Sequence, residues 1–129
     1  MIDRDLPILL VDDYRSMLRI IRNLLRQVGF ANVAEATDAD AALVHLAERR
    51  FGLVISDWNM QPTGGLALLK ALRGEPRTSL VPFIMVTAEG RAEDVLAARD
   101  AGADHYLVKP FNAATLEAKI CHALQGRAA

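Results

Sequence analysis

The stretch Leu53–Asn59 reads Leu-Val-Ile-Ser-Asp-Trp-Asn and places an acidic side chain at the end of a short apolar run. Val11-Asp12-Asp13 and Val108-Lys109-Pro110 follow apolar runs in the same way. Short runs rich in Val, Ile and Leu that end at polar residues are typical of buried strands. Parallel strands of one sheet end at a common edge, so we expect the polar side chains that follow them to converge: Asp12, Asp13, Asp57 and Lys109.

Such a convergence of carboxylates needs a cation. Two carboxylates about 4 Å apart repel by roughly 4 kcal/mol at an effective dielectric constant of about 20. Ligation by oxygen alone suits a hard divalent ion, and Mg²⁺ is the expected one because it keeps its waters and shares its sites with phosphoryl groups. The pattern therefore predicts phosphoryl chemistry on an aspartate.

Length and composition indicate one globular domain that spans residues 1–129. The chain is 52% hydrophobic and 24% charged, and its formal net charge of −1 gives no reason to expect a nucleic-acid partner. A single cysteine, Cys121, excludes an internal disulfide and suits a reducing compartment. The first residues are charged, and no apolar run approaches the roughly 20 residues that cross a bilayer, so we expect a cytoplasmic protein without membrane insertion.

Strand-like runs alternate with segments of helical spacing along the whole chain. The runs expected as strands are Pro7–Val11, Val33–Ala36, Leu53–Asp57, Phe83–Thr87 and His105–Val108. Helices are expected over Arg15–Val28, from Asp38, from Gly64-Gly65 to near Gly74, over Arg91–Ala101 with Gly102 as the stop signal, and from Asn112. The alternation predicts an α/β fold with a parallel sheet and helices on both faces.

Five such units fit the doubly wound, flavodoxin-like strand order 2-1-3-4-5, which we adopt from that class of folds. In this order a ligand site lies at the carboxyl ends of the first and third strands, where Asp12, Asp13 and Asp57 stand. The apolar faces of the helices are expected to include Met17, Ile21, Leu24 and Val28 in the first and Leu66, Leu69 and Leu72 in the third.

The chain resembles the receiver domains of two-component signalling, and within them the chemotaxis response regulators of the CheY type. The resemblance covers nearly the whole chain and rests on Leu10–Asp13, Arg19–Leu25, Val54–Met60, Met85–Glu89, Ala101–Ala103, Tyr106–Phe111 and Ala113–Glu117. It implies a monomeric, phosphorylation-switched signalling protein rather than an enzyme. Its implied partners are a CheA-like histidine kinase, the flagellar motor switch and, in some systems, a phosphatase.

The resemblance also assigns roles at the acidic cluster. Asp57 is the implied phosphoacceptor, a carboxylate nucleophile that forms an acyl phosphate. Asp13 is implied to bind Mg²⁺ directly, while Asp12 holds the ion or one of its waters, and Asp57 shares the ion. Asn59 is implied to offer its backbone carbonyl to the metal while its side chain faces the site of attack. Lys109 is implied to supply a point charge to the phosphoryl group.

A switch is implied farther along the same sheet edge. Thr87 would donate its hydroxyl to the new phosphoryl group, and the Tyr106 ring would turn inward beside the small Ala88. The resulting change would reach the face made by the fourth helix, the fifth strand and the fifth helix, including Lys119. The Lys109–Pro110 bond is implied to be cis. The plainer alternatives are that Thr87 is an ordinary strand residue and Tyr106 an ordinary core residue.

Two features depart from the family or stand outside it. The loop Gln61-Pro62-Thr63-Gly64-Gly65 carries its proline one place late and a glycine where an acid is usual, which predicts a freer loop and no acidic cap on the third helix. The second feature is the set of basic residues spaced along one stripe of the first helix, either a solvated face or an anionic partner surface: Arg15, Arg19, Arg22 and Arg26.

Three functions remain open at this point. The first is a phosphorylation-switched module that docks on the motor switch, and the second is a phosphate sink or phosphorelay shuttle without motor output. The third is an interaction domain that no longer needs phosphate. The intact acid pair, Asp57 and Lys109 argue against the third. The residues do not separate the first two.

Overall fold

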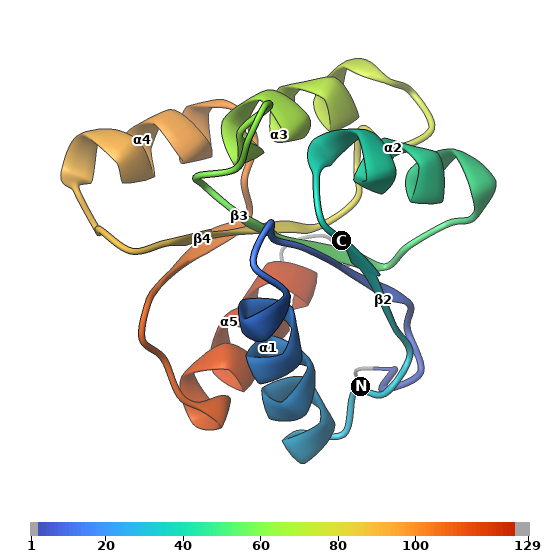
Figure 1. Cartoon of the computed structure of the whole chain (residues 1–129), viewed down its shortest axis with the longest axis vertical. Coiled ribbons are helices and arrows are strands. Elements are labelled where there is room, and N and C mark those ends of the chain that lie inside the picture. Colours follow the sequence, from blue (N-terminus) through green and yellow to red (C-terminus); the bar gives the residue numbers. More distant parts are fainter. Residues whose placement is uncertain (1–2, 126–129) are drawn as a thin grey trace.

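Five parallel strands form the centre of the fold in the computed structural model, which describes residues 3–125 (Figure 1). The elements in chain order are β1 (Ile8–Val11), α1 (Arg15–Gln27), β2 (Val33–Ala36), α2 (Ala39–Glu48), β3 (Leu53–Asp57), α3 (Gly65–Gly74), β4 (Phe83–Thr87), α4 (Ala92–Asp100), β5 (His105–Val108) and α5 (Ala113–Gln125). The strand order is β2-β1-β3-β4-β5, so the expected doubly wound fold is confirmed.

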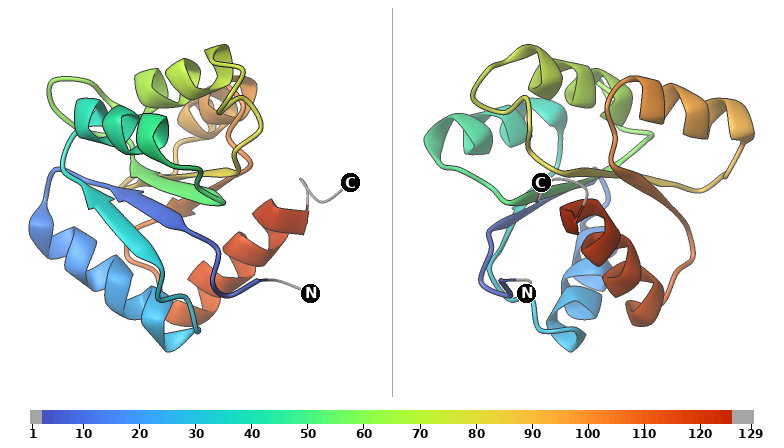
Figure 2. Two further views of the ribbon diagram at one scale, coloured as in Figure 1. Left: turned by 90° about the vertical axis from the view of Figure 1, so that its right-hand side faces the viewer. Right: turned by 180° about the vertical axis from the view of Figure 1, so that it is seen from behind.

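The helices form a layer on each face of the sheet. Helices α1 and α5 cover one face, and α2, α3 and α4 cover the other (Figures 1 and 2). Successive residues of a strand point to opposite faces. Ile8 and Leu10 of β1 therefore pack in the core beside α1 and α5, whereas Leu9 and Val11 pack in the core beside the other three helices. All of β1 and β3 is buried, which explains their nearly continuous apolar runs.

The ends of the helices follow local capping chemistry. The Asp38 side chain accepts a hydrogen bond from the Ala41 N–H at 2.7 Å and so caps α2. Asn112 accepts from the Thr115 N–H at 2.8 Å at the start of α5. Gly29 and Gly102 have φ angles of 95° and 105°, which favour glycine after the ends of α1 and α4. These boundaries agree with the stop and start signals in the sequence.

Two apolar faces lie one residue away from their expected centres. In α1 the fully buried residues are Leu18, Ile21 and Leu25, while Met17, Leu24 and Val28 pack only at the margin. In α3 the buried set includes Leu68 rather than the half-buried Leu66. The apolar stripe of each helix is wider than its contact with the sheet, and the angle at which the helix packs decides which part of the stripe is buried.

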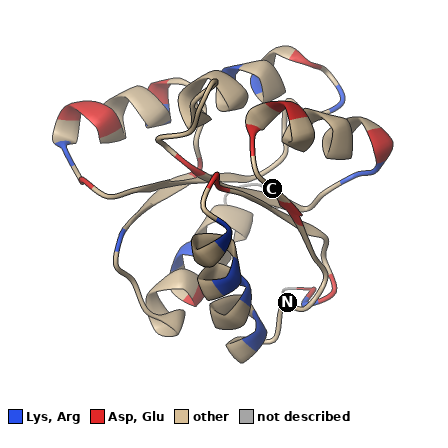
Figure 3. Ribbon diagram, in the orientation of Figure 1, with Lys and Arg blue, Asp and Glu red and all other residues tan. Residues whose placement is uncertain are grey.

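The basic stripe of α1 lies mainly in solvent (Figure 3). Arg15, Arg19 and Arg26 are exposed, whereas Arg22 pairs with Glu35 of β2 at 2.7 Å. One member of the stripe is therefore engaged in holding α1 against the edge strand. Within residues 3–125, every helix is too short or too polar to span a bilayer.

Candidate functional site

The register of the sheet brings three carboxylates together at the ends of β1 and β3. Val11 pairs with Ser56, so Asp12 and Asp13 emerge beside Asp57. One oxygen of each of the three side chains lies within 4.8 Å of the others. Asp12 and Asp57 are 1% and 6% exposed, so two of the three charges are held largely out of water.

Lys109 reaches the same place from the end of β5. Its Nζ lies 3.0 Å from Oδ1 of Asp57 and 3.6 Å from Oδ2 of Asp12. Its backbone N–H donates to the Thr87 carbonyl at 2.8 Å, which ties it to the end of β4. The Lys109–Pro110 bond is cis, as the resemblance implied, and the Gln61–Pro62 bond is also cis, which the sequence analysis did not anticipate.

A single lysine leaves the carboxylates only partly compensated. Among the described residues, Oδ2 of Asp12 and Oδ1 of Asp13 are buried without a hydrogen-bond partner. Burial raises the pKa of Asp12, and the nearby charge of Asp57 raises it further. The hydrogen bond from the Tyr14 N–H and the charge of Lys109 act in the opposite direction and lower this pKa. Burial likewise raises the pKa of Asp57, whereas its hydrogen bond with Lys109 lowers it. Clustered carboxylate oxygens with unused lone pairs fit a hard divalent cation such as Mg²⁺.

A hollow of about 330 Å³ opens above the acceptor candidate. Its walls include two residues that the sequence analysis did not assign to the site, Tyr14 and Gln61. Tyr14 is 67% exposed, and its backbone N–H donates to Oδ1 of Asp12 at 2.9 Å, which orients that carboxylate. The only available signal was adjacency: Tyr14 directly follows Asp13, and Gln61 directly follows the run Val54–Met60. The complete lining is Asp13, Tyr14, Asp57, Asn59, Gln61, Ala88 and Lys109.

The residues expected to switch occupy the neighbouring strands. The Thr87 hydroxyl donates to the Glu89 carbonyl at 2.9 Å and accepts from the Glu89 N–H at 3.1 Å. Tyr106 is half-buried, and Nζ of Lys119 lies 5.1 Å from the centroid of its ring, within the range of a cation–π contact. Thr87 therefore holds the loop after β4, and Tyr106 connects β5 with α5.

The glycine pair before α3 has a steric role that differs from the freer loop expected from the sequence. Gly65 donates its N–H to the Trp58 carbonyl at 3.0 Å. A Cβ at Gly65 would collide with the carbonyl oxygen of Asp57 and lie 2.9 Å from Sδ of Met85. The start of α3 packs against the end of β3 at a distance that only glycine permits. Gly64 caps α3 without a side-chain hydrogen bond, in agreement with the missing acidic cap.

Comparison with known proteins agrees with this geometry. Residues 8–121 match the family model of the response regulator receiver domain. The chain belongs to the response regulator receiver family. This receiver is 43% identical over 119 residues to chemotaxis protein CheY-3 of Vibrio cholerae, with 92% of each chain covered. It is 45% identical over 115 residues to chemotaxis protein CheY of Pseudomonas aeruginosa, with 89% of this chain and 93% of that protein covered.

Solved structures show the same likeness in three dimensions. Chemotaxis response regulator CheY4 of Vibrio cholerae superposes on this receiver with a TM-score of 0.86 and 32% identity, over 93% of this chain and 99% of that one. The receiver is therefore of the CheY type, as the sequence resemblance indicated. A CheY-type receiver is a signalling protein that has a histidine kinase as donor and a downstream partner.

Proposed function

We propose that this receiver accepts a phosphoryl group on Asp57 with the help of Mg²⁺ and then controls the flagellar motor switch. The observation that supports it is the buried Asp57, which faces an open hollow between two further carboxylates and the Lys109 ammonium. A carboxylate in water would have no such set of partners. Membership of the CheY type supports the motor switch as the downstream partner.

The transfer follows from the positions of the side chains. An oxygen of Asp57 attacks phosphorus and forms the new P–O bond, while the bond from phosphorus to the histidine nitrogen of the kinase breaks. Asp12, Asp13 and the Asn59 backbone carbonyl would hold Mg²⁺, which offsets negative charge on the acceptor and the phosphoryl oxygens. Lys109 already lies 3.0 Å from Asp57 and supplies a second positive charge there.

The switch would begin at Thr87. A phosphoryl group carries about −1.5 to −2 charges and strong acceptor oxygens, so it would draw the Thr87 hydroxyl away from Glu89. The loop after β4 would then lose the two hydrogen bonds that the hydroxyl makes with Glu89. Rearrangement beside Ala88 would let the Tyr106 ring turn inward and leave its contact with Lys119. The surface of α4, β5 and α5 would change as a result.

Replacement of the acceptor tests the chemistry. Asp57→Asn should abolish labelling by a phosphorylated histidine kinase or by acetyl phosphate, because an amide is a poor nucleophile. Asp40→Asn is the matched control, since it makes the same change at an exposed position on α2 and should label like the unmodified protein. Stoichiometric labelling of the Asp57→Asn protein would show that the acceptor lies elsewhere.

Chemical-shift mapping tests the switch. Beryllofluoride with Mg²⁺ forms a stable mimic of the phosphoryl group, and it should shift the backbone signals of Thr87, Glu89, Tyr106 and Lys119. The Asp57→Asn protein with the same additions is the control and should show none of these shifts. Shifts that stay at Asp12, Asp13 and Lys109 would contradict the proposed route to the output face, which is the surface formed by α4, β5 and α5.

A pulldown separates motor control from a phosphate sink or phosphorelay shuttle. Motor-switch protein should be retained by the receiver with beryllofluoride and Mg²⁺, and much less without them, because binding shifts a population only through differential affinity. A tenfold preference corresponds to about 1.4 kcal/mol. Labelling on Asp57 together with equal, weak retention in both states would assign the receiver to the sink or shuttle class.

A further inference from the structure

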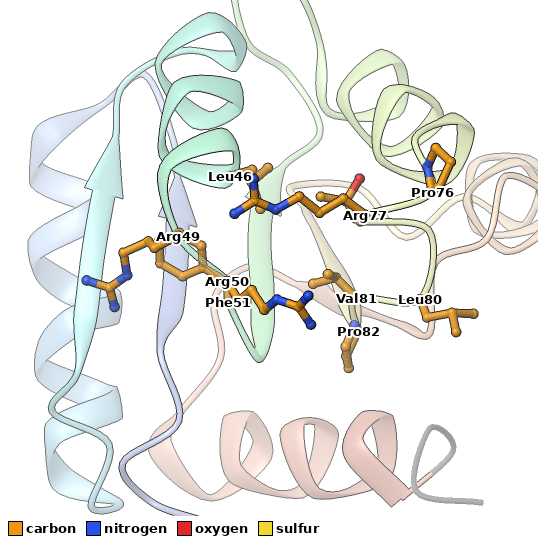
Figure 4. Close-up of a pocket in the computed structure, with 10 residues that line it drawn as sticks. Leu46, Arg49, Arg50, Phe51, Pro76, Arg77, Leu80, Val81 and Pro82 are labelled. Carbon is orange, nitrogen blue, oxygen red and sulfur yellow. The ribbon is translucent and has the colours of Figure 1, made fainter.

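A second hollow, of about 410 Å³, lies at the edge of the sheet opposite to the acidic cluster. It opens between the C-terminal end of α2 and the segment that leads from α3 into β4 (Figure 4). Phe51 and Pro82, which line it, precede β3 and β4, whereas Asp57 ends β3. The hollow is therefore separated from the acceptor by the length of the strands, and the proposed phosphoryl chemistry does not use it.

The walls of this hollow are apolar. Leu46 of α2 and Phe51 are buried, at 3% and 6% exposure, and half-buried Val81 joins them. Leu80 on the rim is 73% exposed, the most exposed large hydrophobic residue of the described chain. A third hollow, of about 370 Å³, lies between α2 and α3, shares Leu46 and continues the apolar surface to Leu43, which is 39% exposed. Exposed apolar residues that gather at a hollow mark a contact site more often than scattered ones do.

Three arginines surround the same apolar surface. Arg49 stacks over the Phe51 ring, with its guanidinium carbon 4.7 Å from the ring centroid. Arg77 donates to the Ala47 carbonyl at 2.8 Å. Figure 4 shows Arg50 extending toward Val81 and Pro82 and Arg77 extending toward α2.

Within residues 3–125, no carboxylate lies within 4.0 Å of any of these three guanidinium groups. The lining of the larger hollow includes no acidic residue. Glu75 is the one carboxylate that lines the neighbouring hollow. This end of the receiver therefore combines positive charge that lacks a carboxylate partner with apolar surface that lacks a cover.

We propose that this hollow is a docking site for an acidic segment of a partner protein, which places a bulky apolar side chain against Phe51 and Leu80 and its carboxylates on Arg50 and Arg77. Arginine is suited to carboxylate ligands because its planar fork can donate two parallel hydrogen bonds. A small inorganic anion would leave the apolar walls uncovered. A nucleic acid would meet Leu80 and Glu75 where it needs further basic residues.

Selection from a random peptide library displays the chemistry of the occupant directly. Peptides are selected on the immobilised full-length receiver and counter-selected on the double variant Arg50→Glu, Leu80→Ser. Enriched sequences should combine Asp or Glu with Leu, Phe, Tyr or Trp. Enrichment of basic or uncharged sequences, or no enrichment above the counter-selected protein, would overturn the proposal.

Affinity measurements on the strongest selected peptide then locate the site. Arg50→Glu should weaken binding at least tenfold, and Leu80→Ser should weaken it severalfold, in a titration followed by fluorescence anisotropy. Arg19→Glu is the matched control, because it makes the same charge reversal at an exposed position on α1 and should leave the affinity unchanged. Equal loss in Arg50→Glu and Arg19→Glu would reveal attraction by overall charge and would overturn a specific site.

Further measurements distinguish loss of binding at this site from loss of folding or of phosphoryl transfer. The circular dichroism and unfolding midpoint of each variant show whether it folds, and nuclear magnetic resonance should place the peptide-induced shifts at Phe51, Leu80 and Val81. Labelling of Asp57 should be the same in Arg50→Glu as in the unmodified receiver, so failure of this docking site would not affect the proposed phosphoryl chemistry. Shifts confined to α1 or to the output face would contradict the proposed location.

Discussion

At the scale of single residues, Asp12 is a buried carboxylate of the acidic cluster whose charge is only partly compensated. Its Oδ1 accepts from the Tyr14 N–H, whereas its Oδ2 has Lys109 at 3.6 Å and no hydrogen bond among the described residues. Burial raises its pKa, so the folded state holds the proton more tightly than the unfolded state does. This carboxylate therefore lowers stability as pH rises from about 3.8 through its raised pKa. The proposed function uses this charge to hold Mg²⁺, and a bound cation would offset its cost to stability.

Asp12→Asn should raise the free energy of unfolding by about 1 kcal/mol in the presence of a chelator, because it removes a buried and partly unpaired charge. The asparagine oxygen can still accept from the Tyr14 N–H. The same variant should lose most of the stabilisation that Mg²⁺ gives the unmodified receiver, since a ligand stabilises only the state that binds it. Urea unfolding with chelator and with saturating Mg²⁺ measures both effects, and equal stabilisation of the two proteins by Mg²⁺ would contradict a metal role for Asp12.

Trp58 offers a direct spectroscopic view of the same site. It is half-buried, directly follows Asp57, and its backbone N–H donates to the Val86 carbonyl at 2.7 Å. Its fluorescence should change when Mg²⁺ binds, because the charge beside the indole changes. A Mg²⁺ titration of emission checks this, with the Asp13→Ala protein as a control that should bind the ion weakly. Constant emission in a sample that calorimetry shows to bind Mg²⁺ would make Trp58 an ordinary packed residue.

At the scale of secondary-structure elements, the site depends on the contact between β3 and α3. Helix α3 begins at Gly65, whose Cα approaches the carbonyl of Asp57 so closely that no Cβ fits. The Trp58 carbonyl accepts the Gly65 N–H, so helix and acceptor strand share a hydrogen bond directly after Asp57. The position of the Asp57 carboxylate therefore depends on how α3 packs.

Gly65→Ala should lower the free energy of unfolding by about 1–3 kcal/mol, because an overpacked contact forces the backbone to shift. It should also slow the proposed labelling of Asp57, since the collision falls on the backbone carbonyl of Asp57 itself. Gly74→Ala is the matched control at the other end of α3, where an added Cβ meets nothing within 4 Å. That control should be neutral or slightly stabilising, and equal destabilisation of both variants would rule out the steric explanation.

At the scale of the whole molecule, the packing of β5 against α5 brings together two histidines that are distant in the sequence. The rings of His105 in β5 and His122 in α5 meet edge to face, with their centroids 4.9 Å apart. Burial lowers the pKa of His105, and the charge of Lys119 and the neighbouring His122 lower it further. The folded state therefore binds the proton of His105 less tightly than the unfolded state does.

Because the pKa of His105 in the folded state lies below the ordinary histidine value of about 6.5, stability should be lost as pH falls below that value toward the folded-state pKa. His105→Gln should make the free energy of unfolding depend less steeply on pH in this range. The reduction in slope should be less than about 1.4 kcal/mol per pH unit, the limit for a single proton. Urea unfolding of both proteins at several pH values between about 7.5 and 5.5 covers the window below the unfolded pKa of about 6.5. Parallel curves for the two proteins would contradict the assignment to His105.

The sequence by itself determined the elements, their alternation and the convergence of Asp12, Asp13, Asp57 and Lys109. These features depend on local patterns and on a general property of parallel sheets, in which strands end at a common edge. Apolar period and capping residues act over a few neighbouring positions, so the sequence displays them directly. The resemblance to receivers then identified the family that the comparison confirms.

Only the tertiary structure decided which contacts join segments far apart in the chain. The steric role of Gly65, the pairing of Arg22 with Glu35 and the contact of His105 with His122 each depend on the packing angle between two elements. The same holds for the hollow beside Arg50 and Arg77, whose walls come from α2, the loop between α2 and β3, and the segment before β4. Periodicity specifies that a helix face is buried, but the shape of its neighbours determines which side chains meet there.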